Sequence, residues 1–288
     1  YTQLQMNAQA AISAMELYEA FGETEYLSRG VSFARILMAC QASAVDPSFS
    51  IPLRGYFYEN ETHERIQTYY HRSYEHAPIK AFAMLYRLAP EHEDAARWKN
   101  SLELYREYVA LTSRTVPYGL LPNGIYELDN TDFSTITHEG ARAAGAPSLE
   151  EYNAQVRNGI RLNDRFYLRV FPVAYQFRGF HATLMGRALA AMELARALND
   201  REIKQVAVRQ MEWILGCNPF AVSSMYGEGH DYHPLYAPMS PQLVGAVPVG
   251  FETFENEDQP FYPMQNNATY KEVWVHTTCR MMWLIAML

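Results

Sequence analysis

The amino-acid sequence predicts an all-α protein, a toroid of helical hairpins that forms a single domain over residues 1–288. Two observations lead to this fold class. Apolar residues recur at helical spacing in paired segments, and each pair is interrupted by a short break that contains Gly, Pro or Asn. Long loops rich in aromatic and histidine residues separate the pairs. Because short turns would then lie at one end and long loops at the other, we expect a site at the mouth that the long loops form.

The first hairpin occupies the start of the chain. Its first helix is predicted by apolar residues at steps of three and four, which are Leu4, Ala8, Ala11, Met15, Tyr18 and Phe21. Gly22 ends this helix, because glycine readily adopts the left-handed conformation that follows a helix. A second helix over 27–38 follows a short turn, so the two helices are expected to lie antiparallel.

Two more hairpins and a last helix follow. Residues 79–109 repeat the pattern around the break Ala89-Pro90-Glu91, and residues 188–214 repeat it around Leu198-Asn199-Asp200. The chain is therefore predicted to be an irregular repeat of hairpins. Residues 273–288 predict a further helix, whose strongly apolar composition indicates an inner position without a solvent face.

Long loops connect these helices at 46–70, 116–147 and 216–272. A connection as long as the last one is normally functional or disordered when it occurs in a compact domain. Its aromatic content argues against disorder. We therefore expect this loop to carry function.

The composition argues against several classes of function. A formal net charge of −8 without any run of Lys or Arg argues against nucleic-acid binding. No apolar run reaches the roughly eighteen residues that cross a bilayer, and no signal peptide is visible. Twenty-one Tyr and four Trp would suit carbohydrate binding, although bulky helix packing explains them equally well.

The ends and the cysteines add two expectations. The chain begins at Tyr1 and soon reads as the middle of a fold, so an additional N-terminal segment is expected. Cys40, Cys217 and Cys279 are too few and too scattered for a disulfide framework or a Cys-x-x-Cys metal site. All three are expected to be small buried side chains. No cofactor is indicated.

Two stretches beside the hairpins offer side chains for a substrate. The stretch 69–76 contains Tyr74 and precedes the second hairpin, where a helix start capped by Ser73 is the alternative. Arg178 and His181 precede the third hairpin, where a guanidinium could bind a carboxylate or a sugar hydroxyl. For this stretch and for the neighbouring stretch 164–169, a salt bridge that tethers loops is the alternative.

The loop over 216–272 also holds two histidines and an acidic run. His230 and His233 have His-x-x-His spacing, but no third ligand accompanies them, so no metal site is predicted. The acidic run at 252–258 is most simply a solvated loop, with calcium binding as the alternative.

Glu272 is the residue best suited to chemistry. It lies between Tyr270 and Trp274 at the start of the last, apolar helix. Its carboxyl group would be partly desolvated there, which favours the protonated form that a general acid needs. The alternative is an ordinary glutamate that complements the dipole of a helix.

Some of these residues form recognisable motifs. Leu215-Gly216-Cys217-Asn218-Pro219 is followed by Ser223 or Ser224, by Gly227-x-Gly229 and by Pro234. This run resembles the Leu-Gly-x-Asn-Pro stretch of glycoside hydrolase family 9. Tyr270-Lys271-Glu272-Val273 is similar to the segment that carries that family's catalytic acid, and Arg178-Gly179 is similar to the Arg-Gly that opens an inner helix. The resemblance is clearest over about the last 110 residues.

The resemblance implies a fold, an activity and a set of site residues. The family has an (α/α)6 barrel of six hairpins, and about four can be counted here, so the toroid is expected to be incomplete and to represent the C-terminal portion of a catalytic domain. The implied activity is hydrolysis of a β-linked polysaccharide or oligosaccharide by inversion, with Glu272 as the general acid, in a secreted or periplasmic protein. The implied substrate-binding residues are Arg178, His181, His230, His233, Tyr74 and Trp274.

Departures from the family pattern leave alternatives open. His230 and His233 lack the arginine that accompanies such histidines in the family, and Thr278 stands where the family usually has Asn. The Asp-Ala-Gly-Asp element that supplies the family's base has no counterpart in this sequence. In the family this element lies early in the catalytic domain, so a chain that begins after it would lack the base while retaining the acid. A non-catalytic carbohydrate-binding relative is one alternative. Another is a polysaccharide lyase on the same toroid, which would use Tyr70, His71, Tyr74, His76 and Arg178.

Overall fold

The computed structural model describes residues 2–69, 74–130, 148–173, 180–236, 242–262 and 268–288, and the chain divides into two compact units. The first unit holds Tyr1–Gln67, Tyr74–Thr115 and Arg187–Ala207. The second unit holds Thr68–Ser73, Val116–Gly186 and Val208–Leu288. The single domain predicted over residues 1–288 stays a prediction.

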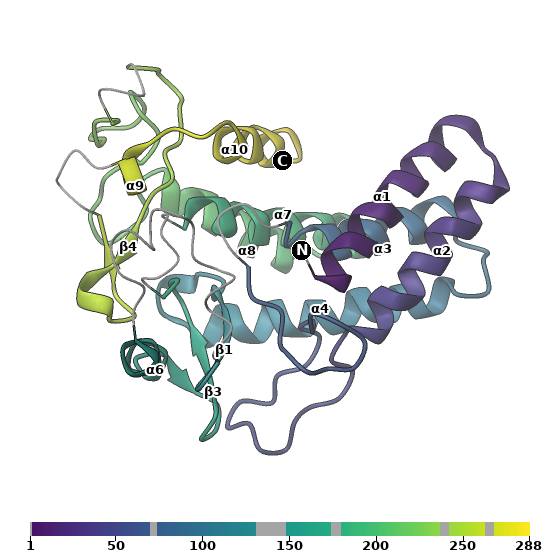
Figure 1. The fold of residues 1–288 in the computed structure, drawn as a ribbon. Coiled ribbons are helices and arrows are strands. Elements are labelled where there is room, and N and C mark those ends of the chain that lie inside the picture. Colours follow the sequence, from purple (N-terminus) through teal and green to yellow (C-terminus); the bar gives the residue numbers. More distant parts are fainter. Residues whose placement is uncertain (1, 70–73, 131–147, 174–179, 237–241, 263–267) are drawn as a thin grey trace. The chain divides into compact units, whose positions relative to one another are not determined.

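Helices make up most of the regular structure (Figure 1). They are α1 (Gln3–Phe21), α2 (Thr24–Ala39), α3 (Ala77–Leu88), α4 (Ala95–Thr115), α6 (Leu149–Arg157), α7 (His181–Leu198), α8 (Arg201–Ile214), α9 (Ala268–Lys271) and α10 (Val275–Ala286). The strands are short and are β1 (Gly124–Glu127), β2 (Ile160–Arg161), β3 (Phe166–Arg169), β4 (Glu252–Thr253) and β5 (Pro260–Phe261). Single turns of 3-10 helix lie at Pro117–Gly119 and Phe254–Asn256.

The three predicted hairpins are confirmed as consecutive helices. Residues 22–23 join α1 to α2, residues 89–94 join α3 to α4, and residues 199–200 join α7 to α8. Gly22 has a φ of 72°, and its N–H donates to the carbonyl of Tyr18 at 2.8 Å. The first helix therefore ends at the glycine that predicted its end.

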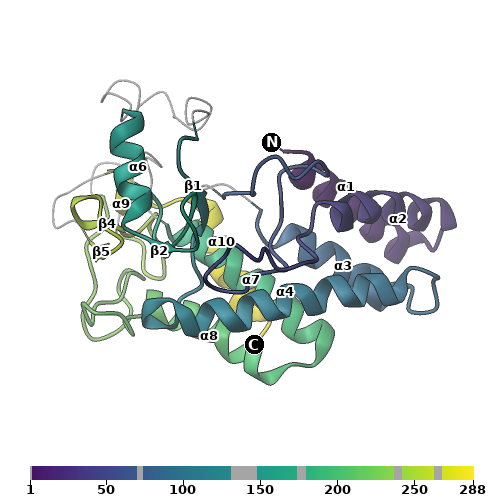
Figure 2. The same cartoon turned by 90° about the horizontal axis from the view of Figure 1, so that it is seen from below.

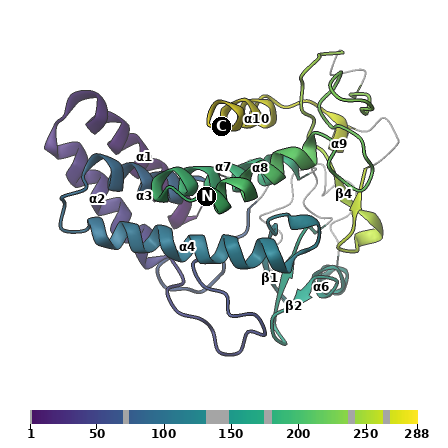
Figure 3. The same ribbon diagram turned by 180° about the vertical axis from the view of Figure 1, so that it is seen from behind.

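Small and apolar side chains hold the helices of the first unit together. α1 lies beside α2 and α3, and α3 lies beside α4 (Figure 3). The face of α1 that the sequence predicts to be buried is buried over most of its length, with Leu4, Ala8, Ala11 and Met15 fully enclosed. The prediction is wrong at its end, where Phe21 is 65% exposed. Gly30 in α2 lets Met15 come close, since a Cβ at that position would lie 2.6 Å from the Met15 sulfur. The absence of a side chain thus brings two helices into contact.

Ion pairs add less to the first unit than this packing. Lys80 of α3 pairs with Glu16 of α1 at 3.0 Å, and Arg87 of α3 pairs with Glu19 of α1 at 2.8 Å. At least one side chain of each pair is exposed to solvent, so each pair is expected to contribute no more than about 1 kcal/mol.

The second unit contains a small antiparallel sheet that the sequence analysis did not predict. Its strand order is β1-β3-β2, with Ile125 and Ile160 both opposite Leu168. Figure 2 shows β1 and β2 of this sheet near α6. α6 contributes Tyr152 and Val156 to the core beside this sheet. A capping box at Ser148 and Glu151 starts α6. Strands of two to four residues are too short to show a period of two, so the residue pattern did not predict them.

The last helix differs from its predicted environment. α10 buries Met281 and Leu284, whereas Val275, Met282 and Ile285 are 79%, 64% and 48% exposed. The prediction of an inner helix without a solvent face is therefore wrong. Apolar composition predicted burial on all sides, but α10 buries only one face in this structure.

Two further observations concern the chain as a whole. Cys40 is buried as predicted, but Cys217 and Cys279 are exposed, so the prediction that all three cysteines are buried is wrong for two of them. Among the helices within the described ranges, none has the length and apolar character to span a bilayer.

Candidate active site

A buried segment, residues 246–251, organises the candidate site in the second unit. Ala246, Val247 and Val249 are fully buried. The N–H of His181, at the start of α7, donates to the carbonyl of Val249 at 3.0 Å. On the other side, the N–H of Val249 donates to the carbonyl of Glu272 at 3.0 Å. The segment therefore links the start of α7 to the residues that lead into α10.

Gly250 allows this segment to lie directly against α7. Its φ is 102°, a conformation that other residues rarely adopt. A Cβ at this position would lie 2.3 Å from Cγ of the His181 ring. Any side chain here would displace either the imidazole or the segment that supports Glu272.

His181 is fully buried against this backbone. Its Nδ1 lies 3.0 Å from the carbonyl oxygen of Pro248, so Nδ1 carries the proton and donates it. Burial lowers the pKa of His181 to about 4, which keeps the imidazole neutral at neutral pH. The predicted contact between His181 and a substrate stays a prediction, and the enclosed ring favours a structural role.

Glu272 directly follows α9, and Val273 and Trp274 separate it from α10. Val273 forms an antiparallel bridge with Pro248, and Trp274 has φ and ψ of −116° and 137°. In extended chain, side chains two residues apart point to the same side. The indole Nε1–H of Trp274 accordingly donates to Oε2 of Glu272 at 2.7 Å. The carboxyl group is half-buried and held in a defined orientation.

Two threonines of α10 fix the position of Trp274 and of the buried segment. The hydroxyl of Thr277 lies 2.7 Å from the carbonyl oxygen of Trp274 and 2.8 Å from that of Val247. The hydroxyl of Thr278 accepts the N–H of Val247 at 3.3 Å. Thr278 stands where the resembled family usually has Asn, and here it supports the segment that carries the site.

The Asn-Pro motif shapes the loop that follows α8. The side-chain amide of Asn218 donates to the carbonyls of Trp213 and Val222 at 2.7 and 2.9 Å. Its carbonyl oxygen accepts the N–H of Phe220 at 3.1 Å. One side chain thus closes the turn, a role in loop geometry that the motif alone did not reveal.

The two histidines of the His-x-x-His pair have different environments. His230 is exposed, whereas the ring of His233 is stacked on Tyr262 at 4.0 Å between centroids and 7° between planes. Burial, assisted by the charge of Lys271, lowers the pKa of His233. The Lys271 ammonium also lies 5.9 Å from the centre of the Tyr262 ring. Within the described portion of the chain, no three His, Cys, Asp or Glu side chains are grouped so that they could hold a metal ion.

Asp258 corrects the interpretation of the acidic run as a solvated loop. Its carboxylate is buried and accepts the N–H groups of Val170 and Phe171, both at 2.9 Å. Nε of Arg169, which is fully buried, lies 3.5 Å away. Burial raises the pKa of Asp258, although Arg169 and the two amides oppose this shift. The pair joins the end of β3 to the acidic loop, so the predicted alternative of a loop-tethering salt bridge is confirmed for Arg169.

The remaining predicted site residues do not lie beside Glu272 in the described part of the structure. Tyr74 is exposed in the first unit, with its ring 6.1 Å from that of His76. Arg178, Tyr70 and His71 lie outside the described residues. The structure therefore brings Glu272 and Trp274 together and supports them through the residues that surround His181.

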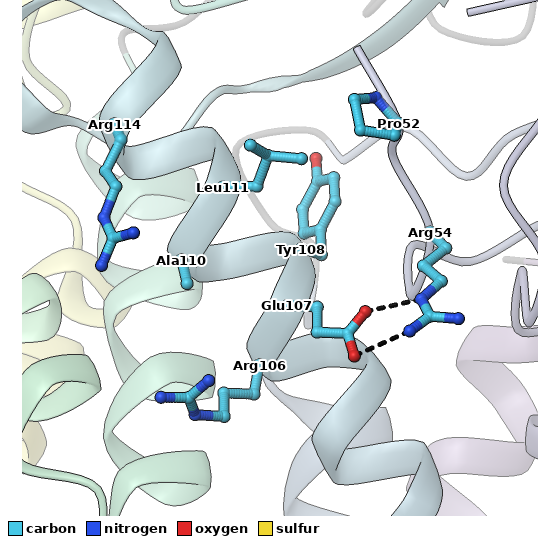
Figure 4. Close-up of a pocket in the computed structure, with 8 residues that line it drawn as sticks. All are labelled: Pro52, Arg54, Arg106, Glu107, Tyr108, Ala110, Leu111 and Arg114. Carbon is cyan, nitrogen blue, oxygen red and sulfur yellow. Dashed lines mark hydrogen bonds and ion pairs between the residues drawn. The ribbon is translucent and has the colours of Figure 1, made fainter.

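A pocket in the first unit contains none of the predicted site residues (Figure 4). Its volume is about 240 Å³, and it is lined by Pro52, Arg54, Arg106, Glu107, Tyr108, Ala110, Leu111 and Arg114. Each arginine already pairs with a carboxylate: Arg54 with Glu107, Arg106 with Asp200 and Arg114 with Glu202. The positive charges are thus neutralised within the unit, and the pocket has no excess charge that would favour an anion.

Comparison with known proteins shows the fold. No protein-family model and no curated protein sequence matches the chain. The solved structure of the cellulase Cel9M of C. cellulolyticum matches 98% of this chain with a TM-score of 0.51 and 14% identity. This chain spans 49% of the length of that cellulase chain. The predicted fold class, an all-α (α/α)6 toroid of helical hairpins, is confirmed by this match. At 14% identity the similarity concerns the fold alone.

Two other solved structures match with lower scores. The catalytic domain of Clostridium thermocellum CelT aligns with 100% of this chain and 61% of its own, at 13% identity and a TM-score of 0.37. A metagenome-derived glycoside hydrolase family 9 endoglucanase aligns with 99% of this chain and 68% of its own, at 13% identity and a TM-score of 0.34.

Proposed function

We propose that this protein is a glycoside hydrolase of family 9 type that cleaves a β-linked polysaccharide or oligosaccharide by inversion, with Glu272 as the general acid. The observation that carries the proposal is the placement of Glu272. In a chain with the fold of a cellulase, the half-buried side chain of Glu272, in the segment between α9 and α10, accepts a hydrogen bond from the indole of Trp274. This is the position at which the sequence resemblance places the acid.

The proposed chemistry requires a proton donor and a water molecule. Glu272 gives its proton to the glycosidic oxygen while the bond from that oxygen to the anomeric carbon breaks. Water adds to the anomeric carbon from the opposite face and loses its proton to a second carboxylate, which lies roughly 6.5–9.5 Å from the acid in inverting enzymes. We assign the first of these roles to Glu272, whose side chain is half-buried.

The proposed substrate is a neutral β-glucan or a related glycan. The cellulase activity that the Cel9M structure is named for suggests this class. Arg178, His230, His233, Tyr74 and Trp274 are proposed to contact the sugar, and His181 is proposed to support the site from within. Because polymers of this kind are degraded outside the cytoplasm, we also propose that the protein is secreted or periplasmic.

The proposal is tested with the wild-type protein and a Glu272→Gln variant on β-glucans, other neutral glycans and uronate-containing glycans. Reducing ends and ultraviolet absorbance are followed together. We expect the wild type to release reducing ends without absorbance and the variant to lose about 10²- to 10⁴-fold in kcat, the usual contribution of general acid catalysis. Glu228→Gln, a change at an exposed glutamate of the same unit, should leave the rate unchanged. Normal turnover by E272Q would exclude Glu272 as the acid.

A second candidate function is a carbohydrate-binding protein without turnover, which would need no base. It would bind oligosaccharides in a calorimeter and release no product from any glycan. Absorbance of an unsaturated uronate would instead indicate a lyase.

A further inference from the structure

Phe220 presents an aromatic ring to solvent in the second unit. The residue lies in the loop that follows α8, and it is 36% exposed. Its ring stacks on the ring of Phe251, with 5.4 Å between the centroids and 16° between the planes. Because Phe251 covers one face of the Phe220 ring, the exposed part of the ring lies at its opposite face and edge.

The turn around Phe220 is closed by bonds that do not involve its ring. The N–H of Phe220 donates to Oδ1 of Asn218 at 3.1 Å, and the N–H of Ala221 donates to the carbonyl of Asn218 at 3.0 Å. Ala221 has a φ of 53°, a left-handed conformation that is uncommon for residues other than glycine. Asn218 therefore fixes the backbone, and the turn itself does not require an aromatic side chain at position 220.

A cluster of aromatic rings supports Phe220 from the interior. Phe251 is 1% exposed, and its ring lies 5.9 Å from the ring of Trp213 and 4.8 Å from that of Tyr262. His233 stacks on Tyr262, as Phe220 stacks on Phe251. The planes of Phe251 and Tyr262 are inclined by 82°, which is an edge-to-face contact. Two solvent-accessible rings, Phe220 and His233, are thus each held by a buried ring of one cluster.

The same buried segment supports this cluster and the backbone of Glu272. Phe251 is the last residue of the segment 246–251. The N–H of Val249 in this segment donates to the carbonyl of Glu272 at 3.0 Å, and the N–H of Gly250 donates to the carbonyl of Tyr270 at 2.6 Å. A substrate contact on Phe220 would therefore be joined to the proposed acid by hydrogen-bonded backbone, and such support keeps a binding residue and a reacting group in register.

We propose that Phe220 is a substrate-binding residue, and that one sugar unit of a β-linked glucan stacks on the exposed face of its ring. This inference rests on the proposed function, because the bound sugar is a unit of the proposed substrate. It adds a binding residue and a mode of contact to that function. It also explains why an apolar ring is exposed at a turn that Asn218 closes without it.

The chemistry of the sugar suits this surface. In a β-linked glucose unit the hydroxyl groups and the linkages are equatorial, so both faces of the ring consist of axial C–H groups. These C–H groups are attracted to the electron-rich face of an aromatic ring, and the contact removes apolar area from water. The equatorial hydroxyl groups stay hydrated at the edge. Phe220 cannot form hydrogen bonds through its side chain, so we expect it to contribute to affinity and not to proton transfer.

The first test measures binding without turnover, by calorimetric titration of the Glu272→Gln protein with a soluble oligomer of β-linked glucose. Adding Phe220→Leu keeps an apolar side chain on Phe251 but removes the flat ring, and it should weaken binding by about 10-fold. Phe220→Tyr keeps the flat ring and should retain the affinity. Phe254→Leu, at a 42% exposed ring of the same unit, is the matched control and should also retain it. Unchanged affinity in F220L, or equal losses in F220L and F220Y, would overturn the proposal.

The second test separates this inference from the proposed function by measuring cleavage of a β-glucan with Glu272 intact. F220L should raise KM by about 10-fold and leave kcat nearly unchanged, because it removes binding that substrate and transition state share. A protein that binds the oligomer through Phe220 but releases no product would refute the hydrolase and keep the binding residue. An active wild type with the same KM as F220L would keep the hydrolase and refute the role of Phe220. A protein that neither binds nor cleaves any glycan would refute both.

Discussion

Burial of His181 lowers the pKa of its imidazole to about 4, from an ordinary value of 6.5. Between these two pH values the unfolded chain binds a proton that the folded chain does not bind. The stability that results is fully present above pH 6.5 and is lost as the pH falls towards 4. A shift of this size corresponds to about 3 kcal/mol. We therefore expect His181→Gln to make the free energy of unfolding less dependent on pH in this range.

The measurement is urea denaturation at several pH values between 4.5 and 7. His230→Gln is the matched control, because His230 is exposed and its replacement should leave the slope unchanged. An H181Q protein with the same pH dependence as the wild type would show that another group causes the loss of stability in acid.

Gly250 gives a second prediction at the scale of the residue. Gly250→Ala should destabilise the protein by about 2–4 kcal/mol, because alanine is strained at positive φ and its Cβ would overlap the His181 ring. Gly245→Ala is the control. Its φ is also positive, at 84°, but its Cβ would meet nothing within 4 Å. Thermal unfolding of the two variants should therefore separate the effect of steric overlap with His181 from the effect of backbone strain. Equal losses of stability in the two variants would contradict the close contact between Gly250 and His181.

The sequence predicted part of the residue-scale picture. Glu272 could be identified because aromatic residues flank it before an apolar helix, a signal that lies entirely in neighbouring positions. The enclosure of His181 could not be predicted, because it depends on residues 246–251, which are far away in the sequence. Asp258 was missed for the same reason. A run of acidic residues indicates solvent unless its buried partner, here Arg169, is known.

At the scale of elements, the pair Arg169–Asp258 joins β3 to the loop between β4 and β5. Asp258→Ala removes the countercharge of a fully buried guanidinium and two acceptor bonds to backbone N–H groups. We expect a loss of about 3–5 kcal/mol, the range for breaking a buried pair from one side. Glu257→Ala, at the exposed neighbour, should cost less than about 0.5 kcal/mol. The measurement is chemical denaturation of both variants. Similar small losses of unfolding free energy in the two variants would contradict a structural role for the Arg169–Asp258 pair.

Helices and strands differed in how well the sequence predicted them. The hairpins were predicted because a period near 3.6 is visible over twelve or more residues, and the breaks at Gly22 and Asn199 mark their turns. β1, β2 and β3 are too short to show a period. α10 was predicted as a helix but placed wrongly, since composition does not reveal which face a neighbour covers.

At the scale of the whole molecule, the fold suggests a class of reaction but does not determine the substrate or the catalytic residues. The match to a cellulase concerns architecture, and linkage specificity depends on loops that a fold class does not define. The motifs in the last part of the chain add a candidate catalytic residue, Glu272, which the fold alone does not identify. Fold and motif together lead to a prediction about stereochemistry that neither supports alone.

If this protein hydrolyses a β-linked glucan by inversion, the first product released must be the α-anomer. A single displacement by water reverses the configuration at the anomeric carbon, whereas a covalent intermediate on the enzyme would retain it. Proton NMR of the anomeric region, recorded before mutarotation equilibrates the product, distinguishes the two courses. The α-signal should appear first in the wild type, and E272Q should form it about 10²- to 10⁴-fold more slowly. Early appearance of the β-anomer would contradict inversion while leaving Glu272 as a candidate acid, because retaining enzymes also protonate the leaving oxygen.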